Sequence, residues 1–288
     1  MSKLFVLYNP IAGDRGGMAA AENAAGFIKD KEFVYQDITK LNDYKAFVAE
    51  LAADDAILVC GGDGTLNRFV NHIYDLKLTQ AIYYYATGSG NDFLRDLGVS
   101  VEDCPVRIDR YLKDLPTVTV EGKTYRFLNG VGYGIDGYCC EVGDELRQKG
   151  KKPDYTGIAI KGLLFHYKPT NATVTVDGVT TTYKRVWIAP TMYGRYYGGG
   201  MMPVPDQDRN HPDRGVAVML MHNSGKIATL CVFPSLFKGA HIKYKKRVQI
   251  IRGQEITVEF DRPVTLQIDG ETIFNVKKYQ ANCPVLVK

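Results

Sequence analysis

The stretch AILVCGGDGTLN, which occupies residues 56–67, decides the fold of this chain. Its first four residues are apolar and predict a buried strand, and from Leu66 onward apolar residues recur at helical spacing. A strand, a glycine turn and a helix in this order direct backbone N–H groups and the positive end of a helix to one place, which is a natural site for phosphate. Asp63 fits such a site if it works with Mg²⁺ or moves a proton. The alternative is a tight turn in which Asp63 caps a helix.

Two more glycine turns follow predicted strands. Residues 10–17 come after a strand expected over 4–9, and residues 88–92 come after a strand expected over 81–85. A helical stretch follows each turn, and this alternation predicts an α/β unit with a largely parallel sheet. Because ligands of such sheets bind beyond the carboxyl ends of the strands, we expect all of these turns to share one edge of the sheet.

Beyond residue 106 the pattern changes to short β-branched runs. The clearest is a predicted hairpin in which Asp177-Gly178 separates the runs 173–176 and 180–183, because Asp-Gly favours a two-residue turn. Further runs of this kind continue to residue 268. We therefore predict a second, β-rich domain that begins near residue 110.

Composition indicates a soluble globular protein. Of 288 residues, 45% are hydrophobic and 24% are charged, as in ordinary folded domains. The net charge of +4 is mild, so no nucleic-acid partner is expected. No apolar run approaches the roughly 20 residues that span a bilayer. The first residues lead straight into a strand pattern without a signal-peptide cleavage region, and we expect the protein in the cytoplasm.

Neither the cysteines nor the histidines indicate a metal or disulfide framework. The six cysteines lack C-x-x-C spacing and the five histidines lack a zinc-ligand spacing,. We interpret the cysteines as small buried hydrophobic residues.

Several ordered motifs carry a family resemblance. They are Tyr8-Asn9-Pro10 with Gly13, the loop 61–67, Gly88-Ser89-Gly90-Asn91-Asp92-Phe93 with Arg95, Asn129 with Gly132, Gly134 and Asp136, Tyr197-Gly198-Gly199-Gly200-Met201, and Gln267-Ile268-Asp269-Gly270-Glu271. In this order and spacing the chain resembles the diacylglycerol kinase catalytic family, in particular the soluble bacterial lipid kinases related to diacylglycerol and sphingosine kinases. The likeness covers nearly the whole chain. The G-G-D-G-T loop alone would also fit NAD kinases.

The resemblance implies two domains around a cleft. One is a three-layer α/β nucleotide domain of the NAD kinase/diacylglycerol kinase type, formed by residues 1–112 and completed by 273–288. The other, residues 113–272, is a β-rich, sandwich-like domain for the lipid substrate.

The resemblance also implies the reaction and its setting. An ATP- and Mg²⁺-dependent lipid kinase would phosphorylate a lipid hydroxyl, with diacylglycerol to phosphatidic acid as the leading reaction. The enzyme would be cytoplasmic, would touch the membrane surface peripherally to reach its lipid, and could form a homodimer through an exposed edge strand. One alternative is a kinase of a soluble hydroxyl compound such as NAD. Another is a nucleotide-binding regulator without catalysis.

The family's functional residues carry over to positions of this sequence. The expected nucleotide contacts are Asn9, Pro10, Gly13, Thr39, Gly61, Gly62, Asp63, Gly64, Thr65, Asn67, Ser89 and Asn91. The expected metal residues are Asp63, Asp92, Asp109 and Asp213. The expected catalytic residues are Asp63, Asp269 and Glu271. One of Asp269 and Glu271 would be the general base on the lipid hydroxyl, with Asp269 preferred, and the other would serve the nucleotide or metal side.

Some of these assignments have a purely structural alternative. Thr39 can be an ordinary helix cap, Asp109 a solvated acid at a strand end, and Asp269 part of a plain hairpin turn. The chain also departs from the family at Arg214, which stands where an aspartate of the structural metal loop is usual. Arginine cannot bind a cation, so this second metal depends on Asp213 or Asp208.

Two kinds of surface bear on the substrate. Basic clusters occur at Lys149, Lys151 and Lys152 and again at Lys243, Lys245, Lys246 and Arg247. Each is either a solvated face or a contact for anionic headgroups. The apolar stretch 158–165 is either helix core or the lining of an acyl-chain pocket,.

Overall fold

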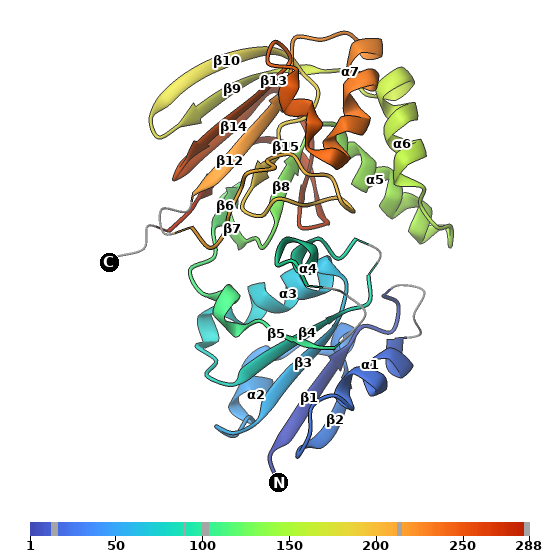
Figure 1. The fold of residues 1–288 in the computed structure, drawn as a ribbon, viewed down its shortest axis with the longest axis vertical. Helices are drawn as coiled ribbons and strands as arrows, with labels where there is room; N and C mark the ends of the chain where they lie inside the picture. The colour runs from blue at the N-terminus through green and yellow to red at the C-terminus, as the bar shows by residue number, and fades with distance from the viewer. Residues whose placement is uncertain (13–16, 89, 100–103, 212–214, 285–288) are drawn as a thin grey trace. The chain divides into compact units, whose positions relative to one another are not determined.

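The computed structural model describes residues 1–12, 17–88, 90–99, 104–211 and 215–284. The chain divides into two compact units, Met1–Lys113 and Asp114–Lys288, whose elements are labelled in Figure 1. Among the described residues, no helix has the length and apolar character needed to cross a membrane.

The first unit is built on a mainly parallel sheet. Its elements are β1 (Lys3–Tyr8), α1 (Gly17–Ala25), β2 (Glu32–Asp37), η1 (Ile38–Lys40), α2 (Tyr44–Ala49), β3 (Ala56–Gly61), α3 (Asp63–Ile73), η2 (Tyr74–Leu76), β4 (Ala81–Ala86), α4 (Asp92–Asp96), β5 (Val106–Arg107) and η3 (Asp109–Leu112). The strand order is β2-β1-β3-β4-β5. The first four strands are parallel and β5 is antiparallel to β4.

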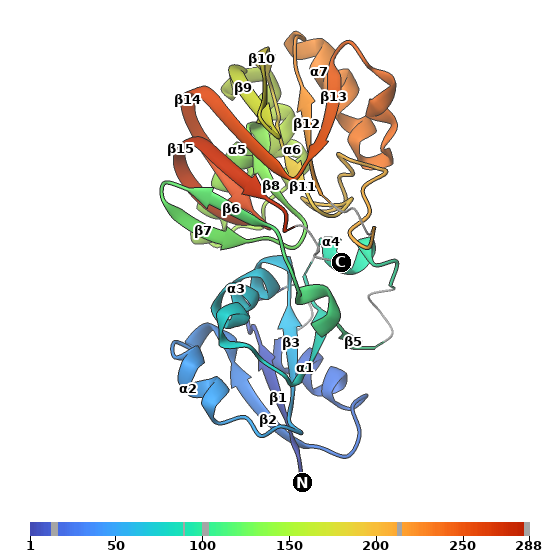
Figure 2. The ribbon, with the colours of Figure 1, turned by 90° about the vertical axis from the view of Figure 1, so that its left-hand side faces the viewer.

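Helices cover both faces of this sheet, which gives the three predicted layers. On one face Leu4 and Val6 of β1 pack with Ala21 of α1. On the other face the Phe5 ring meets Phe47 of α2 edge-on at 5.5 Å between ring centroids. Figure 2 shows α1 on one side of the sheet and α2 and α3 on the other. Strand β3 is buried along its whole length, as expected of a central parallel strand.

The second unit is dominated by antiparallel strands, as predicted. Its elements are β6 (Thr117–Val120), β7 (Lys123–Arg126), β8 (Gly130–Tyr133), α5 (Ile135–Gln148), α6 (Tyr155–Lys161), the π-helical turn η4 (Gly162–His166), β9 (Thr170–Val176), β10 (Val179–Val186), β11 (Thr191–Met192), β12 (Val216–Met221), α7 (Lys226–Val232), η5 (Phe233–Lys238), η6 (Ala240–Lys243), β13 (Val248–Gly253), β14 (Glu255–Ile268) and β15 (Glu271–Asn282). The sheet order is β13-β12-β11-β8-β14-β15-β6-β7, and the β9–β10 hairpin branches from β14. That hairpin turns at Asp177-Gly178, as the sequence predicts.

The last strand corrects one expectation about domain organisation. Residues 273–288 were expected to complete the first domain, but β15 pairs with β14 and with β6 inside the second unit. The reason is local. Ile268 pairs with Glu271 across a two-residue turn, and a strand joined by so short a turn must stay in the sheet of its partner.

The cysteines are all free among the described residues, but only some of them are buried. Cys60, Cys139 and Cys283 lie in the interior, whereas Cys104 and Cys231 are exposed. Burial raises the pKa of the Cys60 thiol to about 12, so this thiol stays protonated and behaves as a small hydrophobic side chain.

Candidate functional site

The glycine turns of the first unit meet at the carboxyl edge of its sheet, as expected. A Cβ added to Gly88 would lie only 2.7 Å from the Cα of Gly62, so these two turns approach as closely as backbones can. The turn after β1 joins them, because Asn9 Nδ2 donates a hydrogen bond to Thr65 Oγ1 at 2.9 Å. Segments distant in the sequence thus form one cluster of main-chain groups.

Asp63 fastens the second turn to the third. Its Oδ2 accepts a hydrogen bond from Asp92 N and its Oδ1 accepts one from Phe93 N, each at 3.0 Å. These amides begin helix α4, so Asp63 caps a helix that starts 29 residues later in the chain. A carboxylate is favourable there because the first N–H groups of a helix lack carbonyl partners within the helix and carry partial positive charge. The capping alternative is therefore realised, on a neighbouring helix.

The remaining phosphate-loop candidates surround the start of α3. Gly62 is the N-cap of α3 and has no side chain to cover the first turn, where backbone amides are available to an anion. Gly61 admits no larger residue, because a Cβ there would lie 2.6 Å from the side chain of Thr65. Asn67 has a partner within its own helix, and its expected nucleotide contact stays a prediction. It is buried, and its side-chain oxygen accepts a hydrogen bond from Asn71 at 3.1 Å.

Several candidates at this edge of the sheet have local roles. Pro10 is exposed, and Asn91 adopts a left-handed conformation with φ of 52° directly before α4. Thr39 follows β2, and its hydroxyl donates a hydrogen bond of 2.6 Å to Asp37 Oδ1. That bond is the main cause of a lowered pKa at Asp37. Asp37, not Thr39, is thus the residue that caps η1.

Asp109 is not brought to the other metal candidates. It follows β5, which runs antiparallel to β4, and the neighbouring Ile108 N donates to Ile82 O near the start of β4. Asp109 therefore lies towards the opposite edge of the sheet from Asp63. Burial alone would raise its pKa, but Arg107 lowers it through a hydrogen bond and its charge, with Nε 2.7 Å from Oδ1. The structure thus corrects the expectation that Asp109 shares a magnesium site with Asp63.

The carboxylates at the glycine turns could bind Mg²⁺ only together with ligands from elsewhere. Over the described part of the chain, no cluster of three or more acidic, histidine or cysteine side chains forms a metal cage. Among the described residues, Asp63 and Asp92 are the carboxylates at the turns, and they are joined through the Asp92 amide. Mg²⁺ characteristically takes one or two carboxylates and completes its shell with phosphate oxygens and water. These two residues therefore fit an ion held largely by a nucleotide.

Asp269 of the second unit is held by a similar main-chain clamp. It lies in the turn between β14 and β15 with φ of 46° and is only 6% exposed. Its Oδ1 accepts hydrogen bonds from Asn129 N and Gly130 N at 2.9 Å, and its Oδ2 accepts one from Leu128 N at 2.5 Å. The hairpin-turn alternative is thus correct for the backbone. The side chain does more, because it anchors a loop about 140 residues earlier in the chain.

Glu271, the other candidate base, begins β15 opposite Ile268 and is half-buried. Between the two acids, Gly270 N donates a hydrogen bond to Gln267 Oε1 at 2.7 Å. The motif 267–271 is therefore an ordered turn that carries both carboxylates within three residues.

Asp136 is a buried acid to which the sequence assigned no role. It lies in the first turn of α5 and is 6% exposed. Neither carboxylate oxygen has a hydrogen-bond partner of normal geometry among the described residues. Burial raises its pKa to about 6, although the nearby Gln267 and Tyr197 side chains oppose that rise. The signal was present in the G-x-G-x-D run, since a Cβ at Gly132 would collide with this carboxylate.

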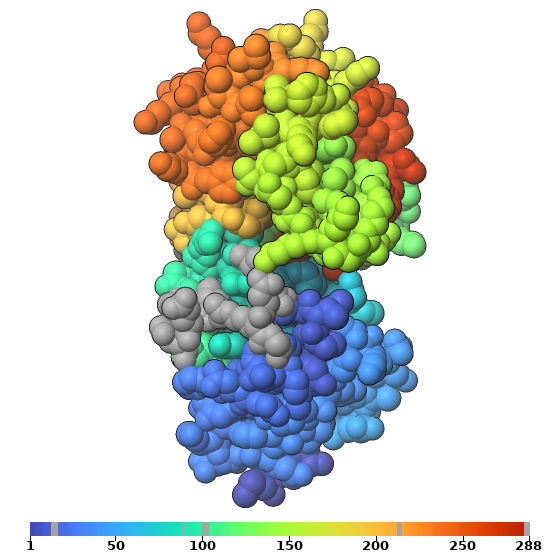
Figure 3. Space-filling model, turned by 90° about the vertical axis from the view of Figure 1, so that its right-hand side faces the viewer, coloured from blue at the N-terminus to red at the C-terminus, as the bar shows by residue number. Residues whose placement is uncertain are grey.

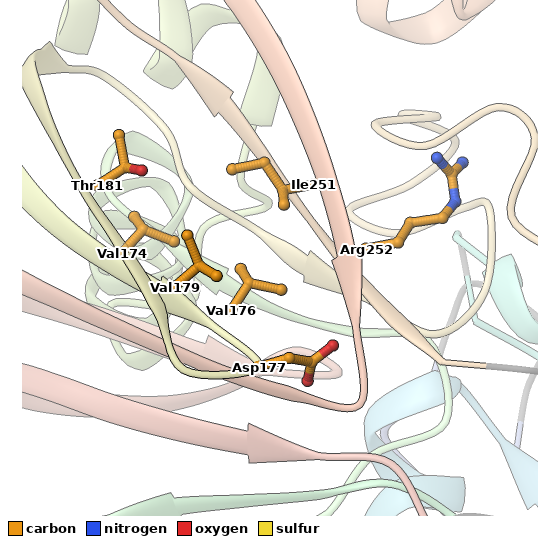
Figure 4. A pocket seen from close by; sticks show the side chains of 7 residues that line it. All are labelled: Val174, Val176, Asp177, Val179, Thr181, Ile251 and Arg252. Atoms are coloured by element: carbon orange, nitrogen blue, oxygen red, sulfur yellow. The ribbon is translucent and has the colours of Figure 1, made fainter.

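Gly13, Ser89 and Asp213 lie outside the described residues. The stretch 158–165 lies partly in the core, because Ile158, Ala159 and Leu163 pack in the main cluster of the second unit, whereas Ile160 and Phe165 are exposed. A separate apolar groove of about 320 Å³ lies between the β9–β10 hairpin and β13. Figure 4 shows its aliphatic side chains together with Asp177 and Arg252.

Known proteins match this chain along nearly its whole length. Residues 3–119 match the diacylglycerol kinase catalytic domain, and residues 129–287 match the YegS C-terminal NAD kinase beta sandwich-like domain. A diacylglycerol kinase of Mycobacterium tuberculosis is 24% identical over 271 residues, covering 90% of this chain and 85% of that protein. The crystal structure of a diacylglycerol kinase from Bacillus anthracis has the same fold, with a TM-score of 0.67 at 17% identity over 98% of this chain and 94% of that one. By these matches to both of its units, the chain belongs to the diacylglycerol kinase catalytic family.

Proposed function

We propose that this protein is a lipid kinase that transfers the γ-phosphoryl group of ATP to the hydroxyl of diacylglycerol. The observation that carries the proposal is the convergence of the glycine turns at the start of α3, with Asp63 bound to two amides of α4. Membership of the family and the names of the relatives support a lipid acceptor.

The first unit binds the nucleotide. Backbone N–H groups of the first turn of α3 bind phosphate oxygens, and Gly61 and Gly62 allow the phosphates to approach the backbone. Asp63 keeps the turns in register by holding the start of α4. Mg²⁺, when bound near Asp63 and Asp92, neutralises charge on the phosphates.

A carboxylate of the second unit accepts the proton of the acceptor hydroxyl. As the acceptor oxygen forms its bond to the γ-phosphorus and the bond to ADP breaks, the hydroxyl proton passes to a carboxylate, and ADP leaves. Asp269 is held in one orientation by three amides, which suits a positioned base. The same bonds stabilise the charged form of the Asp269 carboxylate and therefore oppose its uptake of a proton. For this reason Glu271 is the second candidate for the general base.

One observation keeps a soluble acceptor such as NAD as the second candidate. The second unit matches a domain described as NAD kinase beta sandwich-like. Diacylglycerol and NAD both present an alcohol, so the transfer chemistry is the same and the acceptor has to be identified by experiment.

The test is transfer of label from γ-labelled ATP, with Mg²⁺, into diacylglycerol in mixed micelles or into NAD. Wild type is compared with Asp269→Asn, Glu271→Gln and the matched control Asp206→Asn, whose exposed carboxylate pairs with Arg252 at the surface. We expect labelled phosphatidic acid from wild type and the control. Loss in Glu271→Gln alone would identify Glu271 as the base. Label in NAD only, or activity in neither acceptor, would overturn the proposal.

A further inference from the structure

Two segments of the second unit contain no acidic residue. Residues 155–176 and 215–254 together carry nine lysines and arginines and neither aspartate nor glutamate. Their net charge is therefore +9, whereas the whole chain has +4, so the other residues sum to −5. Both segments are therefore basic, as is the stretch 178–205, which carries three lysines and arginines and no acidic residue.

These two segments pack against each other. Lys226 Nζ, at the start of α7, donates a hydrogen bond of 2.7 Å to Leu164 O in η4. Behind this contact, Leu163 of η4 and Val232 of α7 belong to the same buried cluster. Figure 3 shows the yellow-green segment with α6 and the orange segment with α7 side by side on one surface.

Large apolar side chains are exposed at this junction. The exposed fraction is 72% for Phe165 and 76% for Ile227, with Ile160 at 41%. Phe165 follows Leu164 and Ile227 follows Lys226, so each lies next to one end of the bond that joins η4 and α7. Burying such side chains is favourable, which makes an exposed group of them the mark of a contact surface.

Exposed lysines lie on the same elements and on the elements that pack next to them. Lys161, Lys226 and Lys238 lie on α6, α7 and η5, and the run 243–246 adds further lysines at η6. None of these lysines has a described carboxylate within ion-pair distance. We call the exposed residues of this surface together the docking face: Ile160, Phe165, Ile227, Lys161, Lys226 and Lys238.

We propose that the docking face binds a bilayer that carries anionic headgroups, with Phe165 and Ile227 inserted among the lipids. Lysines at the level of the headgroups and apolar side chains below them are the arrangement that holds a protein on such a surface. A second copy of the face would bring like charges together. Nucleic acid would satisfy the lysines but leave the isoleucines against phosphate. The proposal goes beyond the proposed function, because binding to lipid needs no phosphoryl transfer.

The test measures binding to vesicles without nucleotide. Vesicles of phosphatidylcholine are compared with vesicles in which about one third of the lipid is phosphatidylglycerol, and we expect at least about ten-fold tighter binding to the anionic ones. Phe165→Ser together with Ile227→Ser is expected to weaken binding by about ten-fold or more. The matched control is Val179→Ser with Phe274→Ser, which removes exposed apolar side chains elsewhere in the unit and should bind as wild type does.

Charge and insertion are tested separately. Replacing Lys161 and Lys238 by glutamine should weaken binding about five-fold for each charge removed. A Phe165→Trp variant should show a blue-shifted emission on anionic vesicles, and Val179→Trp should not. The natural Trp187 is only 1% exposed and gives a constant background. Circular dichroism and melting temperature confirm that each variant is folded.

Three outcomes would overturn the proposal. Equal binding by the serine double variant and its control would remove the inserted side chains from the contact. Competition by a short DNA duplex for wild type, with no dependence on Phe165, would indicate a nucleic-acid surface. A change from dimer to monomer in the serine double variant would indicate that a second copy covers the face.

Discussion

Asp269 and Asp136 are buried acids at the two ends of one glycine-bearing run of the second unit, residues 128–136. Asp269 binds the first residues of the run, Asp136 is its last residue, and each acid is 6% exposed. They differ in their partners. Asp269 accepts three backbone hydrogen bonds, whereas neither oxygen of Asp136 has a hydrogen-bond partner of normal geometry among the described residues. Burial raises the pKa of Asp136 to about 6. Whether a buried carboxylate stabilises the fold therefore depends more on the hydrogen-bond donors around it than on how deeply it is buried.

Asp63 of the first unit follows the pattern of Asp269. Both residues accept main-chain N–H bonds from a segment far along the chain, and both belong to motifs that the family resemblance marked as functional. In each case the side chain fixes the shape of a loop, which explains why a short polar residue with several acceptor sites is used there.

The strongest test of this contrast replaces Asp269 by asparagine. An amide keeps one acceptor oxygen but presents N–H groups where Leu128 N donates, so a buried donor is left unsatisfied. We expect the free energy of unfolding to fall by about 2–3 kcal/mol, with loss of phosphate transfer. Urea denaturation beside the Asp206→Asn control measures the change. An unchanged midpoint would mean that the three bonds contribute nothing.

The converse test replaces Asp136 by asparagine. The folded protein keeps the Asp136 proton up to about pH 6, whereas the unfolded chain releases it near 3.8. Ionisation therefore destabilises the fold as pH rises through this window, by up to about 3 kcal/mol when complete above pH 6. Asparagine cannot ionise, so the variant should lack this fall and exceed wild type in stability near neutral pH.

Urea denaturation from about pH 4 to 8 measures that difference. Parallel stability curves for wild type and Asp136→Asn would contradict the assignment, because they would show that Asp136 does not change its protonation on unfolding.

A smaller effect is expected at Asp63. Asparagine there keeps one of the two hydrogen bonds to the start of α4, and the site is half-exposed. We expect a loss of about 1 kcal/mol in the free energy of unfolding, together with a larger loss of ATP-dependent transfer. If the free energy of unfolding falls as much as in Asp269→Asn, the main-chain hydrogen bonds of Asp63 and Asp269 contribute equally, and the difference in burial between the two residues is unimportant.

The smallest effect is expected at Asp109. Its partner Arg107 is largely exposed, so Asp109→Asn should change the free energy of unfolding by less than about 0.5 kcal/mol. Because Asp109 lies away from the glycine turns, the Mg²⁺ concentration needed for half-maximal activity should also be unchanged. A clear shift in that concentration would restore Asp109 as a magnesium residue.

The sequence by itself determined the local structure. Apolar runs followed by glycine turns predicted the strands and helices of the first unit, and Asp177-Gly178 predicted a hairpin that the structure confirms. Such signals act within about ten residues, because they depend on side-chain periodicity and on backbone conformations that glycine permits. The ordered motifs also indicated the family correctly.

Only the tertiary structure decided which residues meet. The donors to Asp63 and Asp269 come from segments 29 and about 140 residues away, and the reversal of β5 carries Asp109 away from the glycine turns. The same holds for the docking face, which two separate segments form together. Hydrogen-bond partners and shared surfaces depend on sheet order and strand direction, and local residue patterns contain neither.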